Sequence, residues 1–107
     1  MTYAADDFPV YADRSTIEGL AGLPRGVRFV LKMLLNIKEG ALTVVLPDGR
    51  ALAFKGEHSG PKAEIRVADF SVIRKTMAGG DVGFAESYMD GDWSTPDLPA
   101  VLAVFSA

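Results

Sequence analysis

The sequence contains no cysteine and only one histidine, His58. A chain without cysteine has no disulfide framework, no thiolate zinc site and no cysteine nucleophile. A single histidine does not supply a histidine-rich metal site, and it lies in a polar, glycine-containing stretch. We therefore expect His58 to be a solvated loop residue, and we predict no metal site and no catalytic residue in this chain.

Long apolar runs and an excess of positive charge are also missing. No stretch reaches the ~18 apolar residues of a membrane span, and Met1–Asp7 lacks the basic residues and the apolar run of a secretory signal. The net charge of −3 argues against non-specific binding to nucleic acid. No glycine-rich turn leads from a strand into a helix, as a nucleotide cofactor would require. The expectation is one cytoplasmic domain without a nucleic-acid partner.

Alternating apolar residues predict a small β-sheet in the middle of the chain. The segment from Gly40 to Gly56 is a predicted β-hairpin, with Pro47-Asp48-Gly49 as its turn. A third strand is expected over Ala63–Ala68, and Glu57–Lys62 is expected to be a loop. Strands followed by helices favour an α+β fold, here a small antiparallel sheet covered by helices.

Helical periodicity marks both sides of this sheet. Expected helices are Thr16–Leu23, Arg25–Ile37, a helix that is capped by Asp69 or Ser71 and runs to about Ala78, Val82–Met89 and Leu98–Phe105. We take residues 1–24 as an N-terminal arm, either partly mobile or packed on the domain, and residues 25–107 as a single α+β domain. Gly79 and Gly80 separate two helices, and Gly91 ends the second one. The expected apolar face of the second helix consists of Phe84, Ala85, Tyr88 and Met89.

The helix Arg25–Ile37 is apolar around most of its circumference. Its polar stripe, which consists of Arg28, Lys32 and Asn36, is narrow. No acid within residues 25–38 opposes the charge of the four bases Arg25, Arg28, Lys32 and Lys38. One interpretation is a core helix with a solvated polar stripe, and the other is a helix that presents apolar side chains to acyl chains or a membrane surface. The second interpretation assigns lipid or membrane contact to Arg25, Arg28, Phe29, Lys32, Met33 and Lys38.

The stretch Phe84–Trp93, FAESYMDGDW, is the most distinctive in the chain. It resembles the (L/F)-(G/A)-E-(A/S)-Y-M-D-G-x-W signature near the N-terminus of cyclopropane-fatty-acyl-phospholipid synthases. These are lipid-modifying methyltransferases that use S-adenosylmethionine. The resemblance extends over roughly residues 25–105. The order of elements also resembles the sterol-carrier-protein-like lipid-binding fold.

The resemblance implies an accessory role. The family's catalytic chemistry lies in a Rossmann-like domain downstream, so this chain is expected to be cut from a longer one, to bind no S-adenosylmethionine and to have no activity alone. The implied role is that of a lipid-engaging N-terminal domain, cytoplasmic or peripheral at the inner membrane face. Its implied partners are phospholipid or a membrane surface, the downstream catalytic domain and a second copy of the chain.

The alternative is a structural or dimerising domain that does not bind lipid. Under either interpretation, aromatic and acidic residues of the signature pack the turn or face a neighbouring domain. The residues assigned to this packing are Phe84, Glu86, Tyr88, Asp90 and Trp93.

Overall fold

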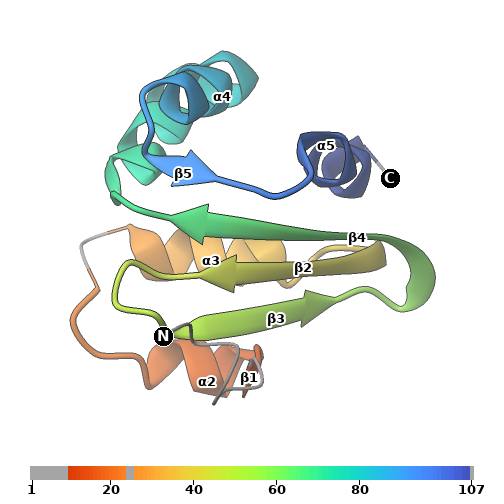
Figure 1. The fold of residues 1–107 in the computed structure, drawn as a ribbon. Coiled ribbons are helices and arrows are strands. Elements are labelled where there is room, and N and C mark those ends of the chain that lie inside the picture. Colours follow the sequence, from red (N-terminus) through yellow and green to blue (C-terminus); the bar gives the residue numbers. More distant parts are fainter. Residues whose placement is uncertain (1–9, 24–25, 107) are drawn as a thin grey trace.

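A computed structural model of the chain describes residues 10–23 and 26–106. It shows an α+β domain, as expected, built on a five-stranded sheet in the order β1-β3-β2-β4-β5 (Figure 1). In chain order the elements are β1 (Val10–Tyr11), α2 (Arg14–Glu18), α3 (Val27–Leu34), β2 (Glu39–Val45), β3 (Ala51–Lys55), β4 (His58–Val67), α4 (Ser71–Met89), β5 (Trp93–Ser94) and α5 (Leu98–Ser106).

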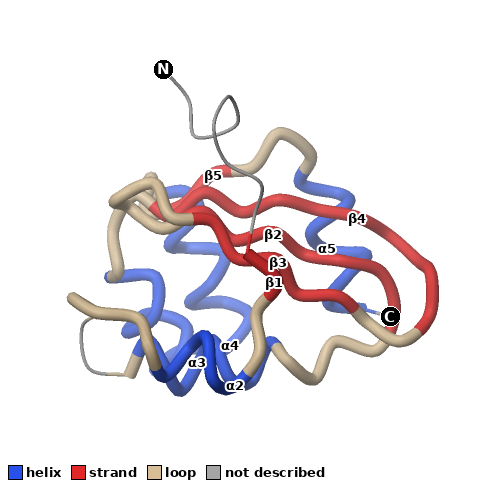
Figure 2. Tube along the Cα trace, turned by 90° about the horizontal axis from the view of Figure 1, so that it is seen from below, coloured by secondary structure: helices blue, strands red, loops and turns tan. Residues whose placement is uncertain are grey.

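The helices gather on one face of the sheet. In Figure 2, α2, α3 and α4 lie below the strands, with α2 beside α3, and α5 lies behind β4 and β2. The core fills the space between these layers, and its centre is the inner face of the hairpin, where Leu42, Leu52 and Phe54 are buried. The alternation that predicted the hairpin is thus confirmed, because Leu42 and Val44 on β2, and Leu52 and Phe54 on β3, are buried two residues apart.

The third strand is longer than expected, and it pairs differently. β4 begins at His58 and not at Ala63, so most of the predicted loop Glu57–Lys62 is strand. It lies parallel to β2, with Leu42 beside Ala63 and Val44 beside Ile65. The sheet is therefore mixed and not purely antiparallel, because the chain leaves β3, crosses the start of β2 and adds β4 on its far side.

Glycines make this crossing possible. Gly40 has φ +83°, and a Cβ built on it would lie 2.0 Å from the carbonyl oxygen of Pro61. A Cβ on Gly56 would lie 2.5 Å from the carbonyl oxygen of Lys38. Any side chain at either position would push the crossing segments apart. The pairing of β2 with β4 therefore depends on backbones that touch without side chains between them.

The segment before α3 is part of the packed domain where the structure describes it. β1 pairs in parallel with β3, and α2 begins at Arg14, earlier than the predicted helix over Thr16–Leu23. The Asp13 carboxylate accepts a hydrogen bond from the backbone N–H of Thr16 at 2.7 Å, which caps α2. Ile17 is fully buried in the core. Residues 10–23 thus pack on the domain, which was one of the two expected alternatives.

The helices after the sheet follow the predicted breaks. α4 runs from Ser71 to Met89 with a sharp kink at Gly80, whose φ of 58° and ψ of −135° are not helical. The two expected helices are therefore the two halves of α4. The Asp69 carboxylate accepts from the N–H of Ser71 at 2.8 Å, and Asp97 accepts from the N–H of Ala100 at 3.1 Å. Gly91 has φ +84° just beyond the end of α4, as its sequence position predicts.

Candidate functional site

α4 and β5 together, residues 71–94, form what we call the signature unit. Its centre is an aromatic cluster in which Trp93 is 2% exposed. The Phe84 ring stacks on Trp93 with centroids 4.3 Å apart, and the Tyr88 ring lies 4.8 Å away at a tilt. The indole N–H of Trp93 donates to the backbone carbonyl of Phe84 at 3.1 Å. The cluster fixes β5 against the second half of α4.

Asp92 connects the parts of the signature unit. Its carboxylate accepts from the Lys75 ammonium and from the Ser87 hydroxyl, both at 2.7 Å. Its backbone carbonyl accepts from the N–H groups of Ala68 and Asp69 at 2.8 and 3.0 Å. One buried residue thereby links both halves of α4 to the end of β4. Such a fully satisfied polar network favours a single arrangement of its members.

The ionisation of this network follows from the same contacts. The hydrogen bonds from Lys75 and Ser87 lower the pKa of Asp92 below its ordinary value of 3.8. The hydrogen bonds to Asp90 and Asp92 raise the pKa of Lys75. The Ser87 hydroxyl is fully buried and donates to a carboxylate, so it is placed as a structural donor. The charge-assisted hydrogen bonds of Asp92 therefore hold the two halves of α4 together.

The signature residues expected to pack are brought together only in part. Phe84, Tyr88 and Trp93 meet in the aromatic cluster, and Asp90 forms an ion pair with Lys75 at 2.8 Å. Glu86 is exposed on the outer side of α4.

The prediction of an apolar face made of Phe84, Ala85, Tyr88 and Met89 on the second half of α4 is wrong in part. Ala85 is exposed and Met89 is 76% exposed. The buried face instead passes through Gly83, Phe84 and Ser87. A Cβ on Gly83 would lie 1.9 Å from the carbonyl oxygen of Lys75, so the two halves of α4 pack too closely there for any side chain.

A second surface lies on α3, where apolar side chains face outward. Phe29 is 59% and Met33 is 55% exposed, and they lie one turn apart on the same side of the helix as Gly26. The Met77 sulfur of α4 lies 3.9 Å from the position that a Cβ would take on Gly26, and Met77 is 60% exposed. We call Phe29, Met33 and Met77 the apolar stripe.

The bases of this region are less free than the sequence suggested. The Arg28 guanidinium donates to the backbone carbonyl of Leu20, and Lys32 forms an ion pair with Glu18 of α2 at 2.5 Å. The hydrogen bond from Lys32 lowers the pKa of Glu18. Arg28 and Lys32 therefore face the segment before α3, and Lys32 has an acidic partner there, although no acid lies within the helix itself. Lys38 is exposed, and Arg25 lies outside the described residues.

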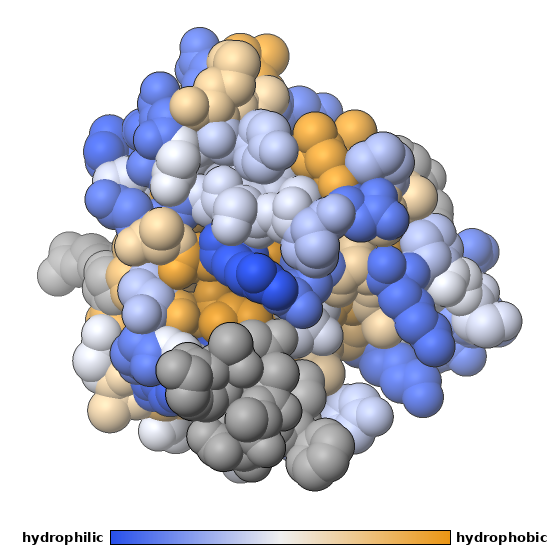
Figure 3. All heavy atoms as spheres, viewed as in Figure 1, coloured by the Kyte–Doolittle hydropathy of each residue, from blue (hydrophilic) through white to orange (hydrophobic). Residues whose placement is uncertain are grey.

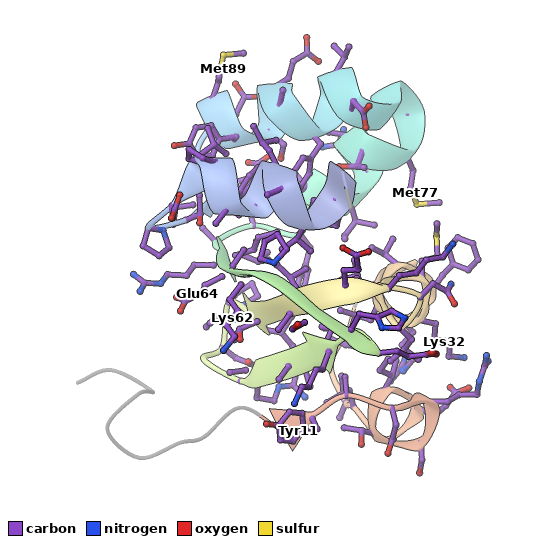
Figure 4. The ribbon with its side chains drawn as sticks, turned by 90° about the vertical axis from the view of Figure 1, so that its right-hand side faces the viewer. Tyr11, Lys32, Lys62, Glu64, Met77 and Met89 are labelled. Carbon is purple, nitrogen blue, oxygen red and sulfur yellow. The ribbon has the colours of Figure 1, made fainter. Side chains whose placement is uncertain are left out.

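The opposite face of the sheet has a different character. In Figure 4, Lys62 and Glu64 extend from one side of β4, whereas Met77 and Lys32 lie on the other side of the sheet. Strongly polar side chains cross the middle of the molecular face shown in Figure 3. Glu64 and Arg66 form an ion pair on this strand. The exposed apolar stripe thus lies on the side of the sheet that carries the helices.

A surface cavity of about 380 Å³ lies where α3 ends and the hairpin crosses into β4. Sequence reasoning missed it, because it assigned His58 to a solvated loop and Lys55 to the end of a hairpin. Its lining residues are Leu35, Asn36, Ile37, Lys38, Lys55, Glu57 and His58. The available signal was a pair of glycines, Gly40 and Gly56, which lie close to these lysines in the sequence and allow two backbone segments to cross there.

Within residues 10–23 and 26–106, no group of three His, Asp or Glu side chains could hold a metal ion. No helix among these residues is both long and apolar enough to cross a membrane. No family model, curated protein or solved structure matches the chain. The resemblances to cyclopropane-fatty-acyl-phospholipid synthases and to the sterol-carrier-protein-like fold therefore stay predictions from the sequence.

Proposed function

We propose that this chain is a non-catalytic domain of a cyclopropane-fatty-acyl-phospholipid synthase-like lipid methyltransferase and that it engages a phospholipid surface. The observation that carries the proposal is the apolar stripe. Phe29, Met33 and Met77 are each more than half exposed, although a small domain gains stability by burying such side chains. An amphipathic helix with this outward face is the type of element that inserts at a lipid interface.

Apolar insertion is the main term in this proposal, and charge is a secondary one. Each side chain of the stripe adds on the order of 1 kcal/mol when its exposed part leaves water. Arg28 is already bonded to the Leu20 carbonyl and Lys32 to Glu18, so less of their charge is available to anionic lipid. Lys38 remains exposed beyond the end of α3. Binding should therefore weaken only moderately with salt, because screening acts on charge and not on apolar contact.

The signature unit supports the second part of the proposed role, which is packing on the downstream domain. Val82 and Met89 are 66% and 76% exposed on the second half of α4. The network around Asp92 holds this half of the helix in one position. A fixed helix with exposed apolar side chains is suited to a permanent contact with another domain.

The test is co-sedimentation with vesicles of phosphatidylglycerol and phosphatidylcholine. Phe29→Ser with Met33→Ser should reduce the bound fraction, while Val82→Ser with Met89→Ser, the matched control on α4, should leave it unchanged. Both double variants remove exposed side chains, so their thermal melts should stay close to that of the unmodified chain. Equal binding by all three proteins, or no binding at all, would contradict the proposal.

The alternative is a structural or dimerising domain in which a second copy covers the apolar stripe. It is favoured by the same exposure of Phe29 and Met33. Sedimentation-velocity analysis without lipid separates the two functions. A dimer that Phe29→Ser with Met33→Ser converts to a monomer would favour the alternative, whereas a monomer for the unmodified chain would favour lipid engagement.

A further inference from the structure

The cavity at the crossing of the sheet combines basic, polar and apolar lining. Lys38, Lys55 and His58 supply nitrogen atoms that can donate, and Asn36 adds an amide. Leu35 and Ile37 form an apolar wall, and both are half-buried. Its volume of about 380 Å³ falls within the range of small-molecule sites, roughly 300–1,000 Å³.

The backbone holds these residues in a defined arrangement. Lys38 precedes β2, Lys55 ends β3 and His58 begins β4, so three neighbouring segments deliver one base each. The N–H of His58 donates to the carbonyl of Lys38 at 3.2 Å, and the N–H of Gly56 donates to the carbonyl of Gly40 at 2.8 Å. The close approach at Gly56 fixes the same segments. The lysines therefore start from anchored strands, which lowers the ordering cost of binding.

The two lysines have no acidic partner within the described part of the chain. The ion pairs found there use Lys32, Arg50, Arg66 and Lys75 as the bases. Lys38 and Lys55 thus present positive charge to the cavity without an internal counter-ion. Glu57 lines the same cavity, so the lining carries two lysines and one acid. The Glu57 carboxylate can accept a hydrogen bond from a hydroxyl or ammonium group.

We propose that this cavity binds the phosphate group of a phosphate ester. Lys38 and Lys55 pair with the phosphate oxygens, Asn36 and His58 donate to them, and Glu57 accepts from a hydroxyl or ammonium group on the same molecule. The cavity begins just after the last turn of α3, where the N–H of Asn36 bonds the carbonyl of Met33. In the sequence its lining therefore starts two residues after Met33 of the apolar stripe.

The phosphate could belong to a free ester or to a lipid head group. Assigning it to a head group rests on the proposed function, because that assignment needs acyl chains at the apolar stripe. The phosphate site itself rests only on the cavity. The two sources are separated by using a small ester and a vesicle as independent probes.

The experiment is a ¹H–¹⁵N NMR titration of the full chain with inorganic phosphate and with glycerol 3-phosphate. Saturable shifts should centre on residues 35–38 and 55–58. Lys38→Gln with Lys55→Gln should weaken binding about tenfold or more, as expected when charge-assisted contacts are lost. Lys62→Gln is the matched control and should bind as the unmodified chain does, because Lys62 is exposed and pairs with the same β2 residue as Lys55, Ala41, but does not line the cavity. If the double variant misfolds, each single variant still tests the site.

The proposal is overturned if neither phosphate nor the ester shifts these amides, or if Lys62→Gln weakens binding as much as the cavity variants. Vesicle binding that depends on Phe29 and Met33 but occurs without any phosphate shift would remove this site and leave the proposed function standing. Conversely, ester binding without vesicle binding would support the site as one for a free ester and contradict the proposed function.

Discussion

The signature unit and the surface formed by α3 and the cavity place polar and apolar residues in opposite ways. In the signature unit, Asp92 is buried and bonded to both halves of α4, and Trp93 is covered by two other rings. On α3, Phe29 and Met33 are exposed, and beyond its end Lys38 has no acidic partner among the described residues. In this chain the most distinctive sequence motif therefore serves the internal structure, while residues outside that motif remain exposed and available for binding.

The comparison also separates two uses of lysine. Lys75 is bonded to Asp90 and Asp92 and joins elements of the same unit. Lys38 and Lys55 lie on anchored segments and line a cavity. A lysine with an internal counter-ion adds to stability, whereas a lysine without one has charge left for a ligand.

The largest expected effect separates the two regions by stability. Trp93→Ala should lower the free energy of unfolding by about 3–5 kcal/mol, because a buried ring and its stacking partner are lost. Phe29→Ala removes an aromatic ring from the apolar stripe and should cost less than about 1 kcal/mol. Urea unfolding of both variants checks the pair. Equal losses of unfolding free energy in the two variants would contradict this prediction, since they would place Phe29 in the core or Trp93 outside it.

A smaller effect is expected where the halves of α4 touch. Gly83→Ala places a methyl group 1.9 Å from the Lys75 carbonyl oxygen, and overpacking of this kind typically costs about 1–3 kcal/mol or more. Gly79→Ala is the matched control, because nothing lies within 4 Å of its Cβ position. It should be neutral or slightly stabilising, since alanine favours helix. Thermal melts that rank the two variants the other way would show that the halves of α4 do not pack as described.

The smallest effect concerns acid stability. Hydrogen bonds from Lys75 and Ser87 lower the pKa of Asp92 in the folded chain, so its contribution is present above the ordinary value of 3.8 and is lost as pH falls through the folded pKa. Asp92→Asn should be less stable than the unmodified chain at neutral pH, and this gap should narrow as the pH falls below about 4.

Asp81→Asn serves as the control for this measurement, because Asp81 is an exposed carboxylate on the same helix. Asp13 and Asp69 also have a lowered pKa, each from a hydrogen bond donated by a backbone N–H, so both proteins share the rest of the acid response. A gap between Asp92→Asn and the unmodified chain that stays constant with pH would show that Asp92 is not held by Lys75.

The fold was predictable where local patterns and packing agree. Neighbouring residues alone indicate the alternation of the hairpin, the breaks at Gly80 and Gly91 and the helix cap at Asp69. The parallel pairing of β4 was not predictable, because residues 58–62 contain glycine, proline and polar groups that signal a loop. They form strand because β2 supplies backbone partners, a tertiary effect that propensity does not contain.

The candidate sites show the same division. The aromatic packing of Trp93 followed from its size and place in the signature. The contacts of α3 were harder to predict. Arg28 bonds Leu20 and Lys32 bonds Glu18, and only the structure shows that these two residues of the preceding segment lie beside α3. The cavity needed three strands to meet, so no single stretch of sequence could reveal it.

The crossing between β3 and β4 also sets an order of assembly. β2, β3 and β4 lie within residues 39–67, so the middle of the sheet is one short, continuous block with low sequence separation between its contacts. Such blocks form quickly, because little loop-closure entropy is lost. β4 reaches β2 only by passing over Lys38 and Gly40, so we expect the hairpin to close before β4 is added. During synthesis residues 39–67 leave the ribosome before residues 71–94, so we expect the signature unit to fold onto a sheet whose centre has already begun to form.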